Sequence, residues 1–123
     1  MLDGFTCVNL FTANAAALLR FYRDILEIPV LFTLNSETDG VNLGFRQGEP
    51  TLCIWDSTQW GSPVRGTVSL VFHCADLDAT CEKLAEKGIQ FAPPVRYDWG
   101  TYELRLADAD GNEVVIVEQA ARN

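Results

Sequence analysis

The sequence predicts an α+β fold made of two tandem βαβββ modules, and three features of the chain indicate it. Two amphipathic helices follow short strands, and Asn14 and Asp76 stand at equivalent places before them as N-cap candidates. Three further strand-like runs follow each helix. A tight-turn sequence at 108–112 precedes the last and most apolar of these runs, at 113–118. Repeated units of this kind predict one sheet and one helix per module.

In the first module, residues 5–11 alternate between apolar and polar, which predicts the first strand. Asn14 then offers an N-cap, and Pro29 should end the helix that begins there. Strands are predicted over 30–34, 41–46 and 51–55, with polar turns between them. The helix is predicted from apolar residues that recur at helical spacing, namely Leu18, Phe21, Tyr22, Ile25 and Leu26.

The second module repeats this order. A strand is predicted over 67–74, and a helix runs from its N-cap candidate Asp76 to Gly88, which should close it. Further strands are predicted over 89–92, ending at Pro93 and Pro94, and over 102–106 and 113–118. Residues 57–66, with two glycines and a proline, predict a linker. We therefore expect one domain over 1–123, with modules at about 4–56 and 67–119.

Charge and composition exclude several classes of protein. The chain has 123 residues, of which 48% are hydrophobic, and a formal net charge of −8. This charge disfavours nucleic acid and anionic membranes, which need clustered Lys and Arg. It suits a cationic or neutral small ligand, although a similar balance often serves only solubility. No apolar run reaches the roughly 18 residues of a membrane span. No signal peptide is visible at the N-terminus, so we expect a cytoplasmic protein.

Four cysteines are present, and no Cys-x-x-Cys spacing occurs among them. A zinc ribbon is therefore not expected. In a protein without an export signal, these cysteines are expected to be reduced thiols rather than a disulfide framework.

Three local patterns carry a resemblance to a known family. They are the run from Asn14 through Phe21-Tyr22 to Leu26, the run from Asp76 to Gly88, and Trp99-Gly100 followed by the Asp-Ala-Asp-Gly-Asn turn at 108–112. Together with the repeat, they resemble the vicinal-oxygen-chelate superfamily of glyoxalase I, bleomycin-resistance proteins and extradiol dioxygenases. The resemblance covers nearly the whole chain. It implies that each curled, mixed four-stranded sheet surrounds a cavity with its helix on the outer face, and that short members form homodimers.

Strand alternation then assigns side chains to the two faces of each sheet. In the first strand, Val8 and Leu10 should face the helix, and in the fifth strand Leu70 and Phe72 should do so. The opposite, cavity side should receive every second residue of four strands: Cys7, Asn9, Phe11, Cys53, Trp55, Ser69, Val71, His73, Val115 and Val117.

The resemblance also locates the positions where metal-dependent members carry ligands. The usual first ligand falls on Cys7, the usual histidine on Ser69, and the two carboxylate positions on Cys53 and Val115. Hard or borderline cations such as Mg²⁺, Mn²⁺, Fe²⁺ and Ni²⁺ prefer carboxylate or imidazole ligands, and none stands at these four places. We therefore expect no metal site of the glyoxalase, dioxygenase or fosfomycin type, and no cofactor.

Two side-chain types leave alternatives open. Cys7 and Cys53 on neighbouring strands either bind a soft metal, or form a disulfide if their Cα atoms lie within about 7 Å, or are simply buried thiols. His73 is the sole histidine. An imidazole there is either a hydrogen-bonded structural group or an acid–base group. Near Trp99, Asp98 and Glu103 are candidates to bind a cation or to accept a proton.

Aromatic residues suggest how a ligand would be held. Trp55, Trp60 and Trp99, together with Phe32 and Tyr102, could form stacking walls for a flat compound, or they could belong to the core or to a dimer interface. Glu103 alternates with Tyr102 and Leu104, so only one of these sets can face the cavity. The candidate ligand-binding residues are Cys7, Asn9, Phe32, Cys53, Trp55, Ser69, His73, Trp99, Tyr102, Glu103 and Val115.

Three functions compete on this basis. The first is a small-molecule binder of the bleomycin-resistance type without the usual metal, which sequesters an aromatic or cationic compound as a homodimer. The second is an enzyme of the superfamily, of lyase or dioxygenase type, whose metal centre is atypical or absent. The third is an interaction scaffold whose cavity is filled by its own side chains. Small side chains at Asn9, Gly44 and Ser69 argue against a filled cavity, and we rank the binder first.

Overall fold

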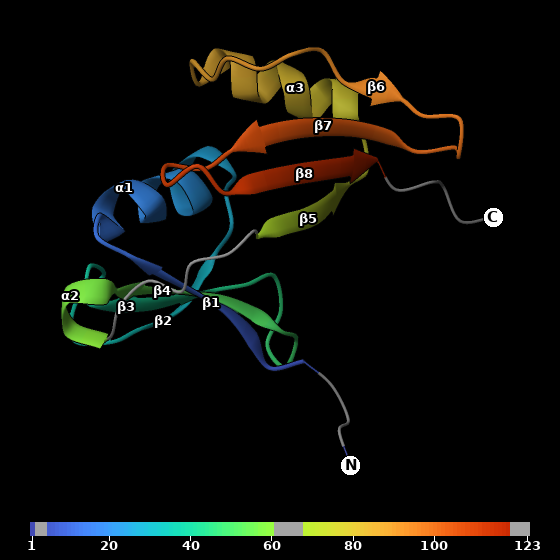
Figure 1. Ribbon diagram of the computed structural model, residues 1–123. Helices are drawn as coiled ribbons and strands as arrows, with labels where there is room; N and C mark the ends of the chain where they lie inside the picture. Colours follow the sequence, from blue (N-terminus) through green and yellow to red (C-terminus); the bar gives the residue numbers. More distant parts are fainter. Residues whose placement is uncertain (2–4, 61–67, 119–123) are drawn as a thin grey trace. The chain divides into compact units, whose positions relative to one another are not determined.

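The computed structural model describes residue 1, residues 5–60 and residues 68–118. The chain forms two compact units, residues 1–66 and residues 67–123. Each unit contains one four-stranded mixed sheet (Figure 1). The sheets are curled and not closed. This α+β arrangement of two βαβββ modules confirms the fold that the sequence predicts.

The first unit contains β1 (Cys7–Thr12), β2 (Val30–Thr33), β3 (Gly40–Leu43) and β4 (Thr51–Asp56), in the spatial order β1-β4-β3-β2. The pair β1 and β4 is parallel, and the other neighbours are antiparallel. Between β1 and β2 lie α1 (Ala15–Leu19) and a π-helix, η1 (Arg20–Ile25). The core of this unit therefore forms where the apolar face of α1 and η1 meets the buried side of the sheet.

The second unit repeats this topology. Its sheet contains β5 (Ser69–Cys74), β6 (Val95–Arg96), β7 (Tyr102–Ala107) and β8 (Glu113–Glu118), in the order β5-β8-β7-β6. The pair β5 and β8 is parallel, as β1 and β4 are. Helix α3 (Leu77–Glu86) contacts β7 and β8, and Figure 1 shows it lying along one face of the sheet. The repeated order of strands confirms the tandem modules.

The helix caps form as predicted because they depend on local hydrogen bonds. The Asn14 side chain accepts a hydrogen bond from the backbone N–H of Ala17, and Asp76 accepts one from Ala79. Gly88 follows the end of α3 with φ +81°, a left-handed conformation that glycine adopts without steric cost. Both helices therefore start where the sequence indicates.

Two predicted elements have wrong boundaries. The first helix ends at Ile25 rather than at Pro29, because Glu27 adopts a φ of +62° and interrupts the helix before the proline. The strand predicted over 89–92 is absent, and β6 forms after the prolines, at Val95–Arg96. Proline lacks an N–H for the sheet, so pairing with β7 begins only beyond Pro94.

The predicted linker is also partly wrong. It begins with a short helix, α2 (Ser57–Trp60), in which the Asp56 carboxylate accepts hydrogen bonds from the backbone and the hydroxyl of Thr58. Residues 61–66 of that linker and the first residue of the predicted fifth strand, residue 67, lie outside the described residues.

Candidate functional site

Each sheet has one face that its helix covers and one that it does not, and we call the second the helix-free face. In the second unit, Leu104 pairs with Ile116 and Leu106 with Val114, and these buried residues lie on the side of α3. The alternate residues face the opposite way. The register agrees with the assignment of Ser69, Val71, His73, Val115 and Val117 to the helix-free face.

Three rows of side chains cross the helix-free face of the second unit. In one row, His73 pairs with Val117, and Val117 pairs with Glu103. The next row joins Val71, Val115 and Arg105, and the third joins Ser69, Glu113 and Ala107. An apolar strip along the middle of the sheet is thus bordered by polar and charged groups.

The charged border is a connected network. Arg105 lies 3.4 Å from Glu103 Oε1 and 3.2 Å from Glu113 Oε2. Ser69 Oγ donates a hydrogen bond to Glu113 Oε1 at 2.6 Å, and this bond holds the pKa of Glu113 below its usual range, with Arg105 acting in the same direction. Thr101 Oγ1 donates to Glu103 Oε2 at 2.5 Å. One guanidinium therefore faces two carboxylates.

An aromatic pair stands at the end of this network. The rings of Tyr97 and Trp99 stack with centroids 4.3 Å apart and planes 10° apart. The Tyr97 hydroxyl is 3.4 Å from Arg105 Nε, so the pair borders the helix-free face. Trp99 remains 69% exposed, and Val71 on the same unit is 65% exposed. Two large apolar side chains are thus open to a ligand.

Tyr102 does not belong to this face. It precedes Glu103 in β7, so it points to the helix side, where its hydroxyl donates to Asp78 Oδ1 of α3 at 2.6 Å. This hydrogen bond raises the pKa of Tyr102, and the guanidinium of Arg96 lies 4.1 Å from its ring centroid. Placing Tyr102 among the cavity candidates is therefore wrong, and Glu103 is the member of that alternation that faces away from the helix.

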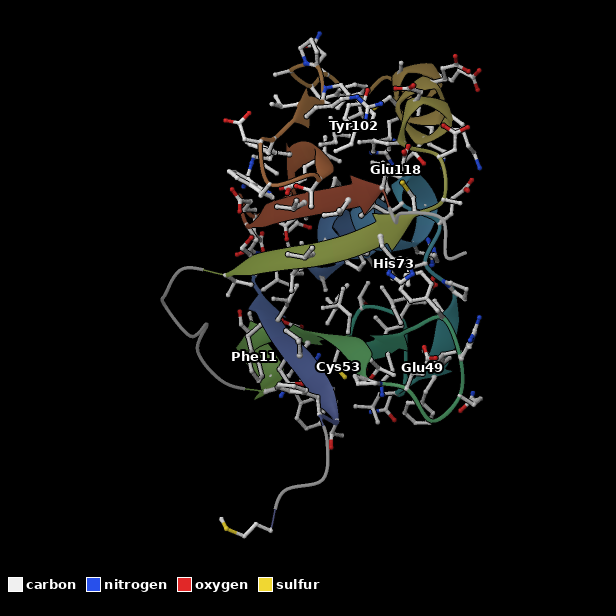
Figure 2. All side chains as sticks on the ribbon, turned by 90° about the vertical axis from the view of Figure 1, so that its right-hand side faces the viewer. Phe11, Glu49, Cys53, His73, Tyr102 and Glu118 are labelled. Atoms are coloured by element: carbon white, nitrogen blue, oxygen red, sulfur yellow. The ribbon has the colours of Figure 1, made fainter. Side chains whose placement is uncertain are left out.

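The helix-free face of the first unit carries a second group of the predicted residues. Asn9 pairs with Cys53, Cys53 with Asn42, and Asn42 with Phe32, so one row crosses all four strands. A second row joins Phe11, Trp55 and Gly40. Trp55 Nε1 donates to Asn9 Oδ1 at 2.9 Å, which fixes the indole over the sheet. Figure 2 labels Phe11 and Cys53 on this sheet.

Gly40 explains how the indole of Trp55 lies so close to the sheet. A Cβ at position 40 would come within 2.7 Å of the ring of Trp55, closer than real Cβ atoms approach. Trp60 meets Trp55 edge to face, with ring centroids 6.1 Å apart. Trp55 is therefore held on three sides, whereas Phe32 in the neighbouring row is more than half exposed.

The candidate residues thus divide between the two units. Cys7, Asn9, Phe32, Cys53 and Trp55 share one face in the first unit, and Ser69, His73, Glu103 and Val115 share one in the second, with Trp99 at its border. Sequence reasoning missed Arg105 and Tyr97, although Arg105 follows Glu103 by two residues and strand alternation alone places both on one face.

The metal that the fold family implies does not fit this chain. The four positions hold two thiols, a hydroxyl and a valine side chain, which is not a donor set for a hard divalent cation. Among residues 5–60 and 68–118, no three His, Cys, Asp or Glu side chains gather where they could hold a metal ion.

In the same part of the chain, no helix is long and apolar enough to cross a membrane.

A two-module α+β protein with an amphipathic helix-free face on each sheet is the class that these features define. The model of the glyoxalase/bleomycin resistance protein/dioxygenase superfamily matches residues 4–116, and the chain belongs to that superfamily. It is 27% identical over 86 residues to the uncharacterized protein YetH of Bacillus subtilis (strain 168), a match that covers 69% of this chain and 71% of that protein.

Solved structures share the fold at low sequence identity. TnmS3, an antibiotic binding protein from Streptomyces sp. CB03234, is 17% identical with a TM-score of 0.77, over 97% of this chain and 98% of its own. A lactoylglutathione lyase from Agrobacterium tumefaciens is 18% identical with a TM-score of 0.75, over 96% and 95% of the two chains. A binder and an enzyme thus share this fold, so the function depends on the site.

Proposed function

We propose that this protein is a small-molecule binder of the bleomycin-resistance type, which sequesters a flat aromatic or cationic compound without the usual metal. The observation that carries the proposal is the exposed ring of Trp99, held by its stack on Tyr97 beside the apolar strip of the second unit. A ring that is already stacked and oriented loses little freedom when a ligand stacks on its open side.

The charges beside this ring favour a cation. Arg105 is held between Glu103 and Glu113, so the network presents two carboxylates for one guanidinium. The whole chain adds a net charge of −8. A planar cation would gain both from the aromatic face and from this negative surface. TnmS3, named as an antibiotic binding protein, gives a precedent for binding on the same fold.

Two further features belong to the same proposal. We place the protein in the cytoplasm, where its four cysteines would stay reduced. We also propose a homodimer, as the family resemblance implies. Sedimentation velocity at micromolar concentration tests the dimer, and a single species with the mass of one chain would contradict it.

Equilibrium dialysis and tryptophan quenching with a panel of planar cationic and neutral ring compounds test the binding. Trp99→Leu should weaken the best ligand by about 1–3 kcal/mol, or roughly 5–150-fold, because it removes an aromatic stacking partner and keeps an apolar side chain. Trp60→Phe, on α2 of the first unit, is the matched loss of one indole and should leave affinity within about twofold. Equal weakening by both variants, or no ligand in the panel, would contradict the proposal.

An enzyme of the superfamily is the alternative function, and the row of His73, Val117 and Glu103 favours it. An imidazole and a carboxylate flank one valine on the same face, which are the groups that proton transfer requires. Elemental analysis of protein purified without chelators, followed by lactoylglutathione and ring-cleavage assays, distinguishes this alternative. Turnover that His73→Gln or Glu103→Gln abolishes would establish the enzyme and displace the binder.

A further inference from the structure

Two thiols lie diagonally across the parallel pair of strands in the first unit. Cys7 on β1 is opposite Thr51, and Asn9 on β1 is opposite Cys53 on β4. All four side chains project from the helix-free face, because residues two apart in a strand share a face. The two cysteines therefore occupy opposite corners of a square of neighbouring side chains.

Each thiol contacts the polar side chain two residues away on its own strand. Cys7 Sγ donates to Asn9 Oδ1 at 3.6 Å, and Cys53 Sγ lies 3.6 Å from Thr51 Oγ1. Thiol hydrogen bonds are weak, so these contacts orient the two sulfur atoms without making them costly to displace.

The two thiols differ in exposure. Cys53 is only 3% exposed, and burial raises the pKa of its thiol, with the neighbouring Cys7 adding to this effect and the hydroxyl of Thr51 opposing it. Cys7 is half-buried. One cysteine is thus shielded and the other is partly exposed, which gives a small ion a route to the pair.

We propose that Cys7 and Cys53 form a dithiolate site for a soft monovalent cation of the Cu(I) class. Thiolates select soft ions, and Cu(I) accepts two sulfur ligands in a linear arrangement, whereas hard divalent cations require more ligands and prefer oxygen. The site lies within the first unit and does not depend on the proposed function, which rests on the second unit.

The binding step involves exchange of protons and no electron transfer. Each thiol releases its proton to solvent, and two Cu–S bonds form, so a neutral dithiol becomes a complex of charge −1. Binding therefore releases two protons for each ion and weakens as the pH falls.

Anaerobic titration of the reduced full-length chain with Cu(I), in competition with the chromophoric chelator bicinchoninate, tests the proposal. The expected result is one Cu(I) per chain. Cys7→Ser is the main variant, because Cys7 is half-buried and the change is small. Changes outside the ligand shell already cost roughly 10–100-fold in metal affinity, so removal of a ligand should weaken Cu(I) binding by more than about 100-fold.

The second unit supplies a matched control. It holds the chain's other two cysteines, Cys74 and Cys81, and the pKa of Cys81 is raised by its own burial. The double variant Cys74→Ser/Cys81→Ser should keep one Cu(I) at unchanged affinity, with two sulfur neighbours in copper K-edge absorption. Three results would overturn the proposal: no binding by the wild-type chain, full binding by Cys7→Ser, or loss of copper in the double variant.

Discussion

At the scale of single residues, hydrogen bonds from hydroxyl groups lower the pKa of two carboxylates in this protein. Ser69 lowers the pKa of Glu113, and Thr58 lowers the pKa of Asp56 through its hydroxyl and its backbone N–H. A lowered pKa means that the folded state favours the charged form. The contribution to stability is therefore present above the ordinary pKa and is lost as the pH falls through the lowered value.

Ser69→Ala should raise the pKa of Glu113 toward its ordinary value of 4.5. The substitution removes the hydrogen bond from Ser69, which is the main interaction that favours the charged form of Glu113. Carboxyl ¹³C shifts measured by NMR between pH 2 and 7 would show this change directly. Thr58→Ala is the matched control, since it should raise the pKa of Asp56 and leave that of Glu113 unchanged. A Glu113 titration that is identical in the wild type and in Ser69→Ala would show that Arg105 alone sets its acidity.

At the scale of elements, the turn between β7 and β8 depends on one buried carboxylate. Asp108 is buried and accepts hydrogen bonds from the backbone N–H groups of Asp110 and Asn112 and from the Asn112 side-chain amide. Gly111 completes the turn with φ +85°. The turn fixes where β8 begins, and β8 pairs with both β5 and β7.

Asp108→Ala should destabilise the protein by about 2–4 kcal/mol, because it removes charged hydrogen bonds and leaves their donors without partners. Urea unfolding followed by circular dichroism measures the change. Asp110→Ala, in the same turn but exposed, should cost less than about 0.5 kcal/mol. Equal costs for both variants would mean that the turn acts only through its backbone conformation.

Elements that depend on hydrogen bonds between residues close in the chain could be predicted from the sequence. The caps at Asn14 and Asp76, the glycine after α3 and the turn at 108–112 depend on side chains within a few residues of the backbone they bind. Interruption of the first helix at Glu27 could not be predicted, because no glycine or asparagine marks that position. The position of β6 could not be predicted, because it depends on which residues pair with β7, a segment further along the chain.

The candidate site was less predictable than the fold for a similar reason. Strand alternation identified the faces of Cys53, Ser69 and His73, because it needs only the period of two. The same period also describes Arg105, two residues after Glu103 in β7. The stack of Tyr97 on Trp99 depends on the conformation of the loop that carries both rings, and no sequence period describes a loop. Trp99 and Glu103 could therefore be predicted as candidates, whereas the partner on which Trp99 stacks could not.

At the scale of the whole molecule, the net charge of −8 has two explanations, solubility and attraction of a cationic ligand. Ionic strength separates them. The screening length falls from about 30 Å at 0.01 M to about 8 Å at 0.15 M. Charges spread over the surface therefore act on an approaching cation in dilute salt and hardly at all in physiological salt, whereas aromatic stacking does not depend on salt in this way.

If the charge serves binding, affinity for a planar cation such as proflavine should fall by about 10-fold between 0.01 and 0.15 M NaCl, with most of the change in the association rate. A neutral ring compound of similar size should keep its affinity within about twofold. Stopped-flow tryptophan quenching measures both. Glu113→Gln should reduce the salt dependence for the cation, because it removes one of the two carboxylates beside Arg105. If both compounds respond equally to salt, the charge of the chain serves solubility, and the ligand is held by stacking on Trp99 alone.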